Sequence, residues 1–138
     1  MAIGRYRKIL VPLDGSDWCE RAIPHAIDVA QTVAESEIVL LRVVTSKDLP
    51  NKAEEEYLTR LQVEVSSQNV SVRTQIIEGT AVAQLICEYV INEGVNLVVM
   101  STHGRTGLAR LFYGSVSRDV MECIDVPVLL IQPEKDEQ

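Results

Sequence analysis

Glycines, hydroxyl-bearing residues and arginines occur together in one stretch of the sequence, where they could bind an anion. Residues 101–115 contain Gly104, Gly107 and Gly114, and a helix is predicted to begin near Ser115. Glycine lets backbone N–H groups approach a ligand closely, and the first turn of a helix presents N–H groups that have no partner inside the helix. Phosphate is the anion that best suits glycine backbone, hydroxyl groups and a helix N-terminus together.

The local charge of this stretch is opposite to the charge of the whole protein. Between Val95 and Arg118 there are three arginines (Arg105, Arg110 and Arg118) and no acidic residue. The 138-residue chain has 13 basic and 20 acidic residues and a net charge of −7. A negative surface repels nucleic acid and anionic lipid, so we expect neither a nucleic-acid partner nor a membrane partner. A small anion at the positive stretch is the better fit.

A simpler explanation of the same stretch stays open from the residues alone. Gly107 and Gly114 could only turn a loop, and Ser115 could only cap a helix. The chain has no Gly-Lys pair and no G-x-G-x-x-G sequence, so both the P-loop and the dinucleotide fingerprint are missing. Ordinary P-loop hydrolysis and nicotinamide redox chemistry therefore lose their main support.

Histidine and cysteine residues give weaker signals. His103 has no carboxylate neighbour in the sequence, so we expect a hydrogen-bonding loop residue rather than an acid or base. Cys19, Cys87 and Cys123 are too few and too scattered for a disulfide framework or a zinc site. We expect Cys87 and Cys123 to be packing residues, and Cys19 to be the thiol worth testing for reactivity.

The elements that must position these residues follow from hydrophobic patterning. Five short β-branched runs alternate with helical periodicity, the pattern of a parallel sheet covered on both faces. The predicted strands are residues 8–13, 38–44, 70–77, 96–100 and 126–131. The predicted inward residues of the four helices are Ala22, Ile23, Ala26, Ile27, Ala30 and Val33; Tyr57, Leu58, Leu61 and Val65; Val82, Leu85, Ile86, Tyr89 and Val90; and Val116, Val120, Met121 and Ile124.

Capping residues suggest where two of these helices begin and end. Asp17 and Glu20 have the spacing of a capping box at the start of the first helix. Pro24 then predicts either a kink in the first turns or a later start. Gly94 is expected to end the third helix.

The composition indicates one folded domain. Hydrophobic residues make up 46% of the chain and charged residues 24%, with 7 glycines and 5 prolines, which excludes disordered and low-complexity classes. We expect a single domain over residues 1–138, with 134–138 as a loose tail. The apolar run at 9–13 is too short for a signal peptide or a membrane span, so we expect a cytoplasmic protein.

An open parallel sheet binds ligands outside the carboxyl ends of its strands, at the point where the strand order reverses. The loops after the first and fourth strands, 14–17 and 101–115, are therefore the expected site. Ser101-Thr102-His103-Gly104, nine residues, then Gly114-Ser115 resembles the G-x2-G-x9-G-[S/T] motif of the universal stress protein family, with Ser101 in place of the first glycine. The runs ILVPLDGS at 9–16 and VPVLLI at 126–131 are also typical of that family.

This resemblance covers nearly the whole chain and carries specific expectations. It implies an α/β fold of the nucleotide hydrolase-like type, with an open five-stranded parallel sheet of order 3-2-1-4-5 and four helices. It implies ATP binding, with Mg²⁺ carried by the phosphates, and a homodimer through the last strand, Val126 to Ile131. By position, the implied residues are Pro12, Leu13, Asp14 and Val43 around the adenine, Ser101 and Gly104 near the ribose and phosphates, Arg105 in the same loop, and Gly114, Ser115, Val116 and Ser117 at the phosphates.

The function implied is a nucleotide-dependent regulatory module of the stress response, with little or no turnover and an unidentified protein partner. Asp14 is expected to recognise the nucleotide through polar contacts rather than to bind a metal. One alternative is an adenylating or ATP-hydrolysing enzyme of a related fold, but such adenylating enzymes carry Ser-Gly-Gly-x-Asp-Ser where this chain has Asp14-Gly15-Ser16-Asp17. Another alternative is a nucleotide-free dimer that acts through protein contacts.

Overall fold

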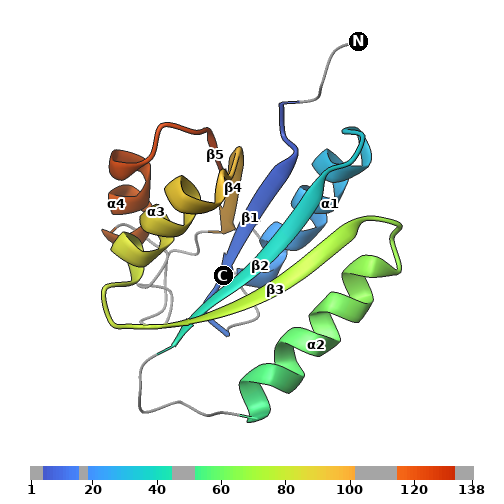
Figure 1. Cartoon of the computed structure of the whole chain (residues 1–138), viewed down its shortest axis with the longest axis horizontal. Coiled ribbons are helices and arrows are strands. Elements are labelled where there is room, and N and C mark those ends of the chain that lie inside the picture. Colours follow the sequence, from blue (N-terminus) through green and yellow to red (C-terminus); the bar gives the residue numbers. More distant parts are fainter. Residues whose placement is uncertain (1–4, 16–18, 45–51, 102–114, 133–138) are drawn as a thin grey trace.

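The five-stranded parallel sheet predicted from the sequence is confirmed. The computed structural model describes residues 5–15, 19–44, 52–101 and 115–132. Its strands lie in the order β3-β2-β1-β4-β5 (Figure 1). The elements along the chain are β1 (Lys8–Leu13), a short 3₁₀ turn η1 (Cys19–Arg21), α1 (Ala22–Gln31), β2 (Glu37–Val44), α2 (Lys52–Ser66), β3 (Ser71–Glu78), α3 (Val82–Glu93), β4 (Leu97–Ser101), α4 (Ser115–Cys123) and β5 (Val128–Ile131).

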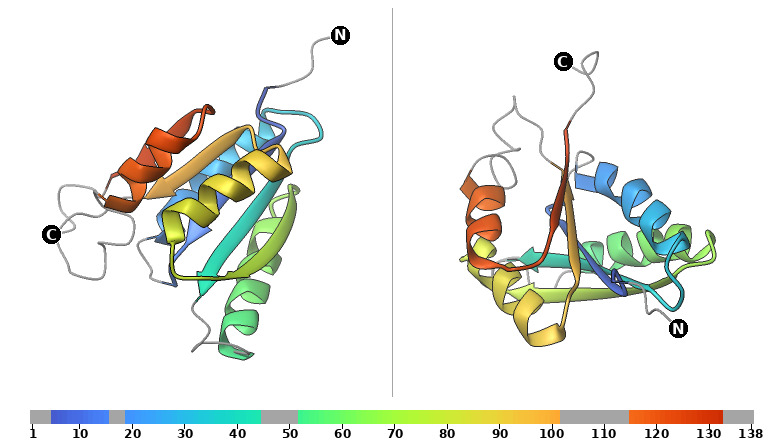
Figure 2. Two further views of the ribbon diagram at one scale, coloured as in Figure 1. Left: turned by 60° about the vertical axis from the view of Figure 1, so that its left-hand side comes forward. Right: turned by 90° about the horizontal axis from the view of Figure 1, so that it is seen from above.

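The helices cover the sheet in two pairs, as Figure 2 shows. Helices α1 and α2 lie on one face and line a common groove, whereas α3 and α4 lie together on the other face. The chain runs outward from β1 through β2 to β3 and then returns to β4 on the other side of β1. Because crossovers between parallel strands are right-handed, this change of direction moves the later helices to the opposite face.

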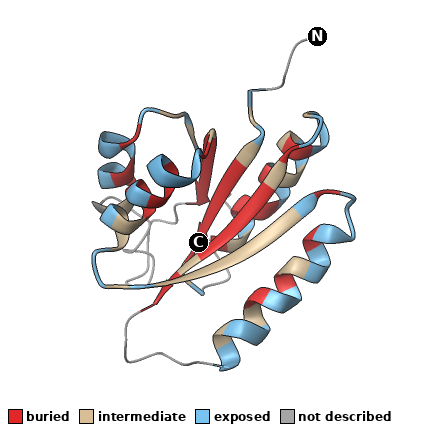
Figure 3. Cartoon of the chain, viewed as in Figure 1, coloured by how far each residue is buried: buried red, intermediate tan, exposed pale blue. Residues whose placement is uncertain are grey.

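The core lies along the three central strands, which are the most deeply buried parts of the sheet (Figure 3). Ile9, Leu10 and Val11 of β1 are fully buried, as are Val98 and Val99 of β4. Both faces of a parallel sheet are packed against helices, so these strands are continuous apolar runs instead of alternating ones. Each such side chain contributes about 1.5–3 kcal/mol on burial.

Hydrogen bonds from Lys8 fix the amino end of β4 beside β1. The Lys8 backbone N–H donates to Asn96 Oδ1 at 2.8 Å, and the Asn96 N–H donates back to the Lys8 carbonyl at 2.8 Å.

Gly94 ends α3 in the left-handed conformation, with φ of 68°, and its N–H donates to the Val90 carbonyl. The predicted end of this helix at Gly94 is confirmed.

Strands β1 and β4 part at their carboxyl ends. Ile9 and Leu10 pair with Leu97 and Val98, but the pairing stops there, although β1 continues to Leu13 and β4 to Ser101. By contrast, β1 pairs with β2 along its whole length. The unpaired ends lie at the switch point, where the order of the strands reverses and where open parallel sheets bind their ligands.

The predicted capping box at the first helix is wrong, and the later start is correct. The N-cap of α1 is Arg21, whose side chain makes no capping hydrogen bond, and the helix begins at Ala22. Pro24 is then its third residue, where the missing N–H costs no helical hydrogen bond. Asp17 lies outside the described residues.

Two predictions at the C-terminal end need correction. Met121 is 42% exposed rather than turned inward, whereas Val120 and Ile124 are buried as predicted. One residue along a helix rotates a side chain by about 100°, which carries Met121 away from the stripe that Val120 and Ile124 share. Strand β5 begins at Val128, two residues later than predicted, because Pro127 has no N–H to donate to the ladder.

The structure pairs two cysteines that the sequence analysis treated as packing residues. Cys87 of α3 and Cys123 of α4 form a disulfide with their Cα atoms 6.2 Å apart. The two residues are 36 positions apart in the sequence. Their proximity depends on α3 and α4 packing on the same face, which spacing along the chain does not reveal.

The remaining cysteine is buried and inert rather than reactive. Cys19 is 2% exposed, and its sulfur accepts a hydrogen bond from the Asp14 backbone N–H at 3.4 Å. Burial, and secondly the Asp14 carboxylate, raise the pKa of the Cys19 thiol from 9.0 to about 12. The thiolate, which is the reactive form, is therefore scarce at neutral pH.

We expect iodoacetamide at pH 8 to modify Cys19 at least about a hundredfold more slowly in the folded protein than in the unfolded protein, because the raised pKa depletes the thiolate. Peptide mapping under non-reducing conditions measures the two rates with the Cys87–Cys123 disulfide intact. The same shift should lower the free energy of unfolding as pH rises from about 9 towards 12, since only the unfolded thiol ionises there. Equal labelling rates in the two states would contradict this assignment.

Candidate functional site

Four residues predicted to border the ligand come together in one small hollow at the carboxyl end of the sheet. This switch-point hollow is formed by the ends of β1 and β2, with α3 beside them. It brings together Pro12, Leu13, Asp14 and Val43, as predicted, and adds Leu41, Arg42, Val82 and Ile86.

The pairing register explains why these residues meet. Pro12 lies opposite Leu41, and Leu13 lies opposite Arg42, so Asp14 leaves β1 next to Val43 at the end of β2. Val82 and Ile86 are one helical turn apart on α3 and close the hollow from one side. The result is a hollow of only about 20 Å³, with an apolar wall and one carboxylate at its edge.

Arg42 is the one charged side chain among the four residues of this hollow that were not predicted. Its guanidinium forms a bidentate pair with Glu54 of α2, with Nη2 to Oε1 and Nε to Oε2 both at 3.0 Å. Nη1 also donates to the Val43 carbonyl at 2.6 Å. The signal was present in the sequence, because Arg42 is the single charge within the apolar run 38–44.

Gly15 lies against the same guanidinium. Its φ is +87°, which only glycine adopts readily, and a Cβ atom there would stand 3.5 Å from Arg42 Nη2. The Arg42–Glu54 pair therefore packs beneath the turn that follows Asp14. This arrangement fixes the direction in which the chain leaves β1.

The predicted phosphate residues lie at the end of β4 and the start of α4. Ser101 and Ser117 are each 4% exposed, and Val116 is half-buried. Helix α4 begins at Ser115, and the N-terminus of a helix carries about half a positive charge with free N–H groups. Gly104, Arg105, Gly114 and His103 lie outside the described residues.

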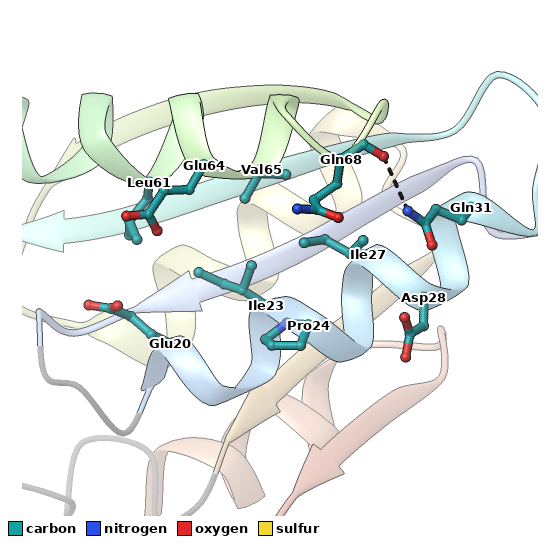
Figure 4. Close-up of a pocket in the computed structure, with 10 residues that line it drawn as sticks. All are labelled: Glu20, Ile23, Pro24, Ile27, Asp28, Gln31, Leu61, Glu64, Val65 and Gln68. Carbon is teal, nitrogen blue, oxygen red and sulfur yellow. Dashed lines mark hydrogen bonds between the residues drawn. The ribbon is translucent and has the colours of Figure 1, made fainter.

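A second concavity lies between α1 and α2 (Figure 4). This α1–α2 groove has a volume of about 390 Å³, and Gln31 Nε2 donates across it to the Gln68 carbonyl at 3.1 Å. Three carboxylates stand along it, those of Glu20, Asp28 and Glu64. Arg60 contacts two of them, Glu20 at 3.8 Å and Glu64 at 3.2 Å. Net negative charge makes the groove a poor place for a phosphate.

No helix in 5–15, 19–44, 52–101 and 115–132 has the length and apolar character needed to cross a membrane. Over the same residues, no three His, Cys, Asp or Glu side chains stand together as a possible metal site.

The comparisons with known proteins agree on one family. The sequence model of the universal stress protein family matches residues 5–132. Universal stress protein MJ0531 of Methanocaldococcus jannaschii is 30% identical in an alignment of length 147. The alignment covers 96% of this chain and 85% of that protein.

Solved structures show the same fold. Protein MJ0577 is also from M. jannaschii. Its structure has a TM-score of 0.79 and 28% identity, covering 96% of this chain and 99% of that one. A universal stress protein family protein from Arabidopsis thaliana, solved with AMP bound, has a TM-score of 0.71 and 23% identity, with 94% of each chain covered. From its sequence, its strand order and these likenesses, the chain belongs to the universal stress protein family.

Proposed function

We propose that the protein binds ATP, or another adenine nucleotide, at the carboxyl ends of β1 and β4, and that occupancy regulates an unidentified protein partner in the stress response. The observation that carries this proposal is the parting of β1 and β4 after Leu10 and Val98. The hollow at the end of β1 and the N-terminus of α4, which follows β4 along the chain, form the two halves of the proposed site. The Arabidopsis relative solved with AMP supports the choice of an adenine nucleotide.

The switch-point hollow is proposed to hold the adenine. Of its aliphatic wall, half-buried Val82 and the 8% exposed Val43 can pack against one face of the ring, while Leu41 and Ile86 support them from the core. Asp14 can accept hydrogen bonds from the base or the ribose. Arg42 is already engaged by Glu54, so it leaves little free positive charge to draw phosphates into the same place.

The phosphates are proposed to lie towards α4. Backbone N–H groups of Ser115, Val116 and Ser117 at the helix start would bind phosphate oxygens, and Ser101, Gly104, Arg105 and Gly114 would complete that end of the site. Mg²⁺ would enter with the phosphates. Asp14 belongs to the base end of this arrangement, where a carboxylate does not oppose the phosphate charge.

Slow or no hydrolysis is proposed because the loop 101–115 at the phosphate end has no acidic residue and the hollow at the base end has one. Of the described residues that line it, Asp14 alone carries a carboxylate, and none is a histidine or a cysteine. Fast hydrolysis needs a positioned base for the attacking water and groups that stabilise the transition state. A single carboxylate at the base end does not supply that pair.

We expect calorimetry with ATP and Mg²⁺ to show binding in the micromolar to millimolar range, and a phosphate-release assay on the same sample to show turnover far below the enzyme median of about 10 per second. The first result tests the site, and the second tests its chemistry. Absence of binding at millimolar ATP would refute the proposed function. Turnover near the median would favour the enzymatic alternative.

Replacing the carboxylate at the base end, Asp14→Ala, should weaken ATP, ADP and adenosine alike by roughly tenfold, since a lost charged hydrogen bond is worth about 1.4 kcal/mol. Asp28→Ala is the matched control, because it removes the same charge from the α1–α2 groove. It should leave all three affinities unchanged. A loss confined to ATP with Mg²⁺ would instead make Asp14 a metal ligand.

A homodimer through β5 is proposed from the contrast between the two edges of the sheet. Strand β3 presents Ser71, Arg73 and Gln75, and Arg73 pairs with Glu37 at 3.5 Å. Strand β5, at the other edge, is Val-Leu-Leu-Ile, with Leu129 39% exposed. An apolar edge invites pairing with another strand, so a second copy of β5 is the proposed cover.

Light scattering at micromolar concentration should therefore report a dimer that Leu129→Lys converts to a monomer, because a charge on this edge opposes burial. Val63→Lys, on α2, changes a side chain that is 64% exposed and should leave the dimer intact. Monomeric wild-type protein, or a dimer that survives Leu129→Lys, would place the interface elsewhere or remove it.

A further inference from the structure

The disulfide between α3 and α4 lies in the helix pair that contains the proposed phosphate-binding terminus. Cys87 is near the middle of α3, and Cys123 is the last residue of α4. Their Cα separation of 6.2 Å falls within the range of about 4.4–6.8 Å that disulfides adopt. Helix α4 is thus attached covalently at one end and, in the proposed function, binds phosphate at the other.

Besides this bond, α4 packs against the core through its buried face. It has nine residues, and a helix of this length is not stable alone in water. Val120 is fully buried, Ser117 is 4% exposed and Val116 is half-buried. The residues that face outward are Arg118, Asp119, Met121 and Glu122. The disulfide therefore adds a covalent link to the packing of this short helix against α3.

The cysteine pair is built so that both redox states can be accommodated. The Val120 carbonyl oxygen stands 3.9 Å from Cys87 Sγ and 3.4 Å from Cys123 Sγ, so it can accept a hydrogen bond from a thiol after reduction. Cys87 is 5% exposed, whereas Cys123 is exposed. A small thiol or disulfide can therefore reach the pair from the Cys123 side.

We propose that Cys87 and Cys123 form a reversible redox site that sets the affinity for adenine nucleotides through the order of α4. The inference rests on the proposed function for its effect on affinity. In the oxidised state the disulfide holds α4 against α3 and keeps its N-terminus in place for the phosphates. In the reduced state α4 gains freedom, and binding must include the cost of ordering it.

The chemistry needs a low-molecular-weight disulfide as oxidant. The Cys123 thiolate, after giving up its proton, attacks that disulfide, forms a mixed disulfide and releases one small thiol. The Cys87 thiolate then attacks the Cys123 sulfur, forms the Cys87–Cys123 bond and releases the second small thiol. The protein loses two electrons and two protons, and the small disulfide gains them. An excess of small thiol reverses both steps.

The test compares full-length protein oxidised with excess glutathione disulfide and the same protein reduced with dithiothreitol. Mass spectrometry after alkylation should count one free thiol in the first sample and three in the second. Hydrogen exchange of the α4 amides should be slower in the oxidised sample. Calorimetry should show ATP binding at least about fivefold tighter in the oxidised sample, the lower range of allosteric couplings.

Two variants separate the pair from other redox effects. Cys123→Ser changes an exposed residue, and we expect it to show the reduced-state exchange and affinity in both buffers. Cys19→Ala keeps the pair and should respond as the wild type does. A response that persists in Cys123→Ser would overturn the proposal.

The outcomes also distinguish this inference from the proposed function. If neither sample binds ATP, the proposed function fails, and the exchange of α4 still decides whether the disulfide controls its order. If ATP binds equally in both samples, the proposed function stands and the redox site does not control it. Unchanged exchange of α4, or failure to form the Cys87–Cys123 bond, overturns the inference whatever the nucleotide does.

Discussion

The site depends on the way β1 and β4 stop pairing before they end. Two residue pairs, Ile9 with Leu97 and Leu10 with Val98, hold the strands together at their buried centre. Beyond them the strands diverge, because the helices after β1 and β4 pack on opposite faces of the sheet. Continued pairing would have filled the switch point with backbone. The hydrogen bonds of Lys8 and Asn96 hold the two strands together at the opposite end.

Electrostatics separates the α1–α2 groove from the switch-point hollow. The groove is larger than the hollow, but Glu20, Asp28 and Glu64 stand along it. The switch-point hollow is smaller and has Asp14 as its one acidic side chain among the described residues, with Arg42 balanced by Glu54. A protein of net charge −7 can attract an anion only where its charge is locally reversed, and the sequence from Val95 to Arg118 provides that reversal.

Much of the fold could be predicted because β-branched runs and helical stripes report burial directly. Strand β1 begins and ends as predicted, and α3 ends at Gly94. The errors arise where distant parts of the chain decide the outcome. No local pattern reveals that Cys87 meets Cys123, or that Arg42 pairs with Glu54. Of the predicted site residues, those at the ends of β1 and β2 come together in the hollow, and the glycine loop lies outside the described residues.

The Arg42–Glu54 pair joins the end of β2 to the first turn of α2, on either side of the segment 45–51. The pair fixes the two ends of this segment relative to each other. The entropic cost of closing a loop between fixed ends rises slowly with loop length, by about 0.6 kcal/mol for each doubling. Residues 45–51 are therefore a natural position for grafting a longer peptide.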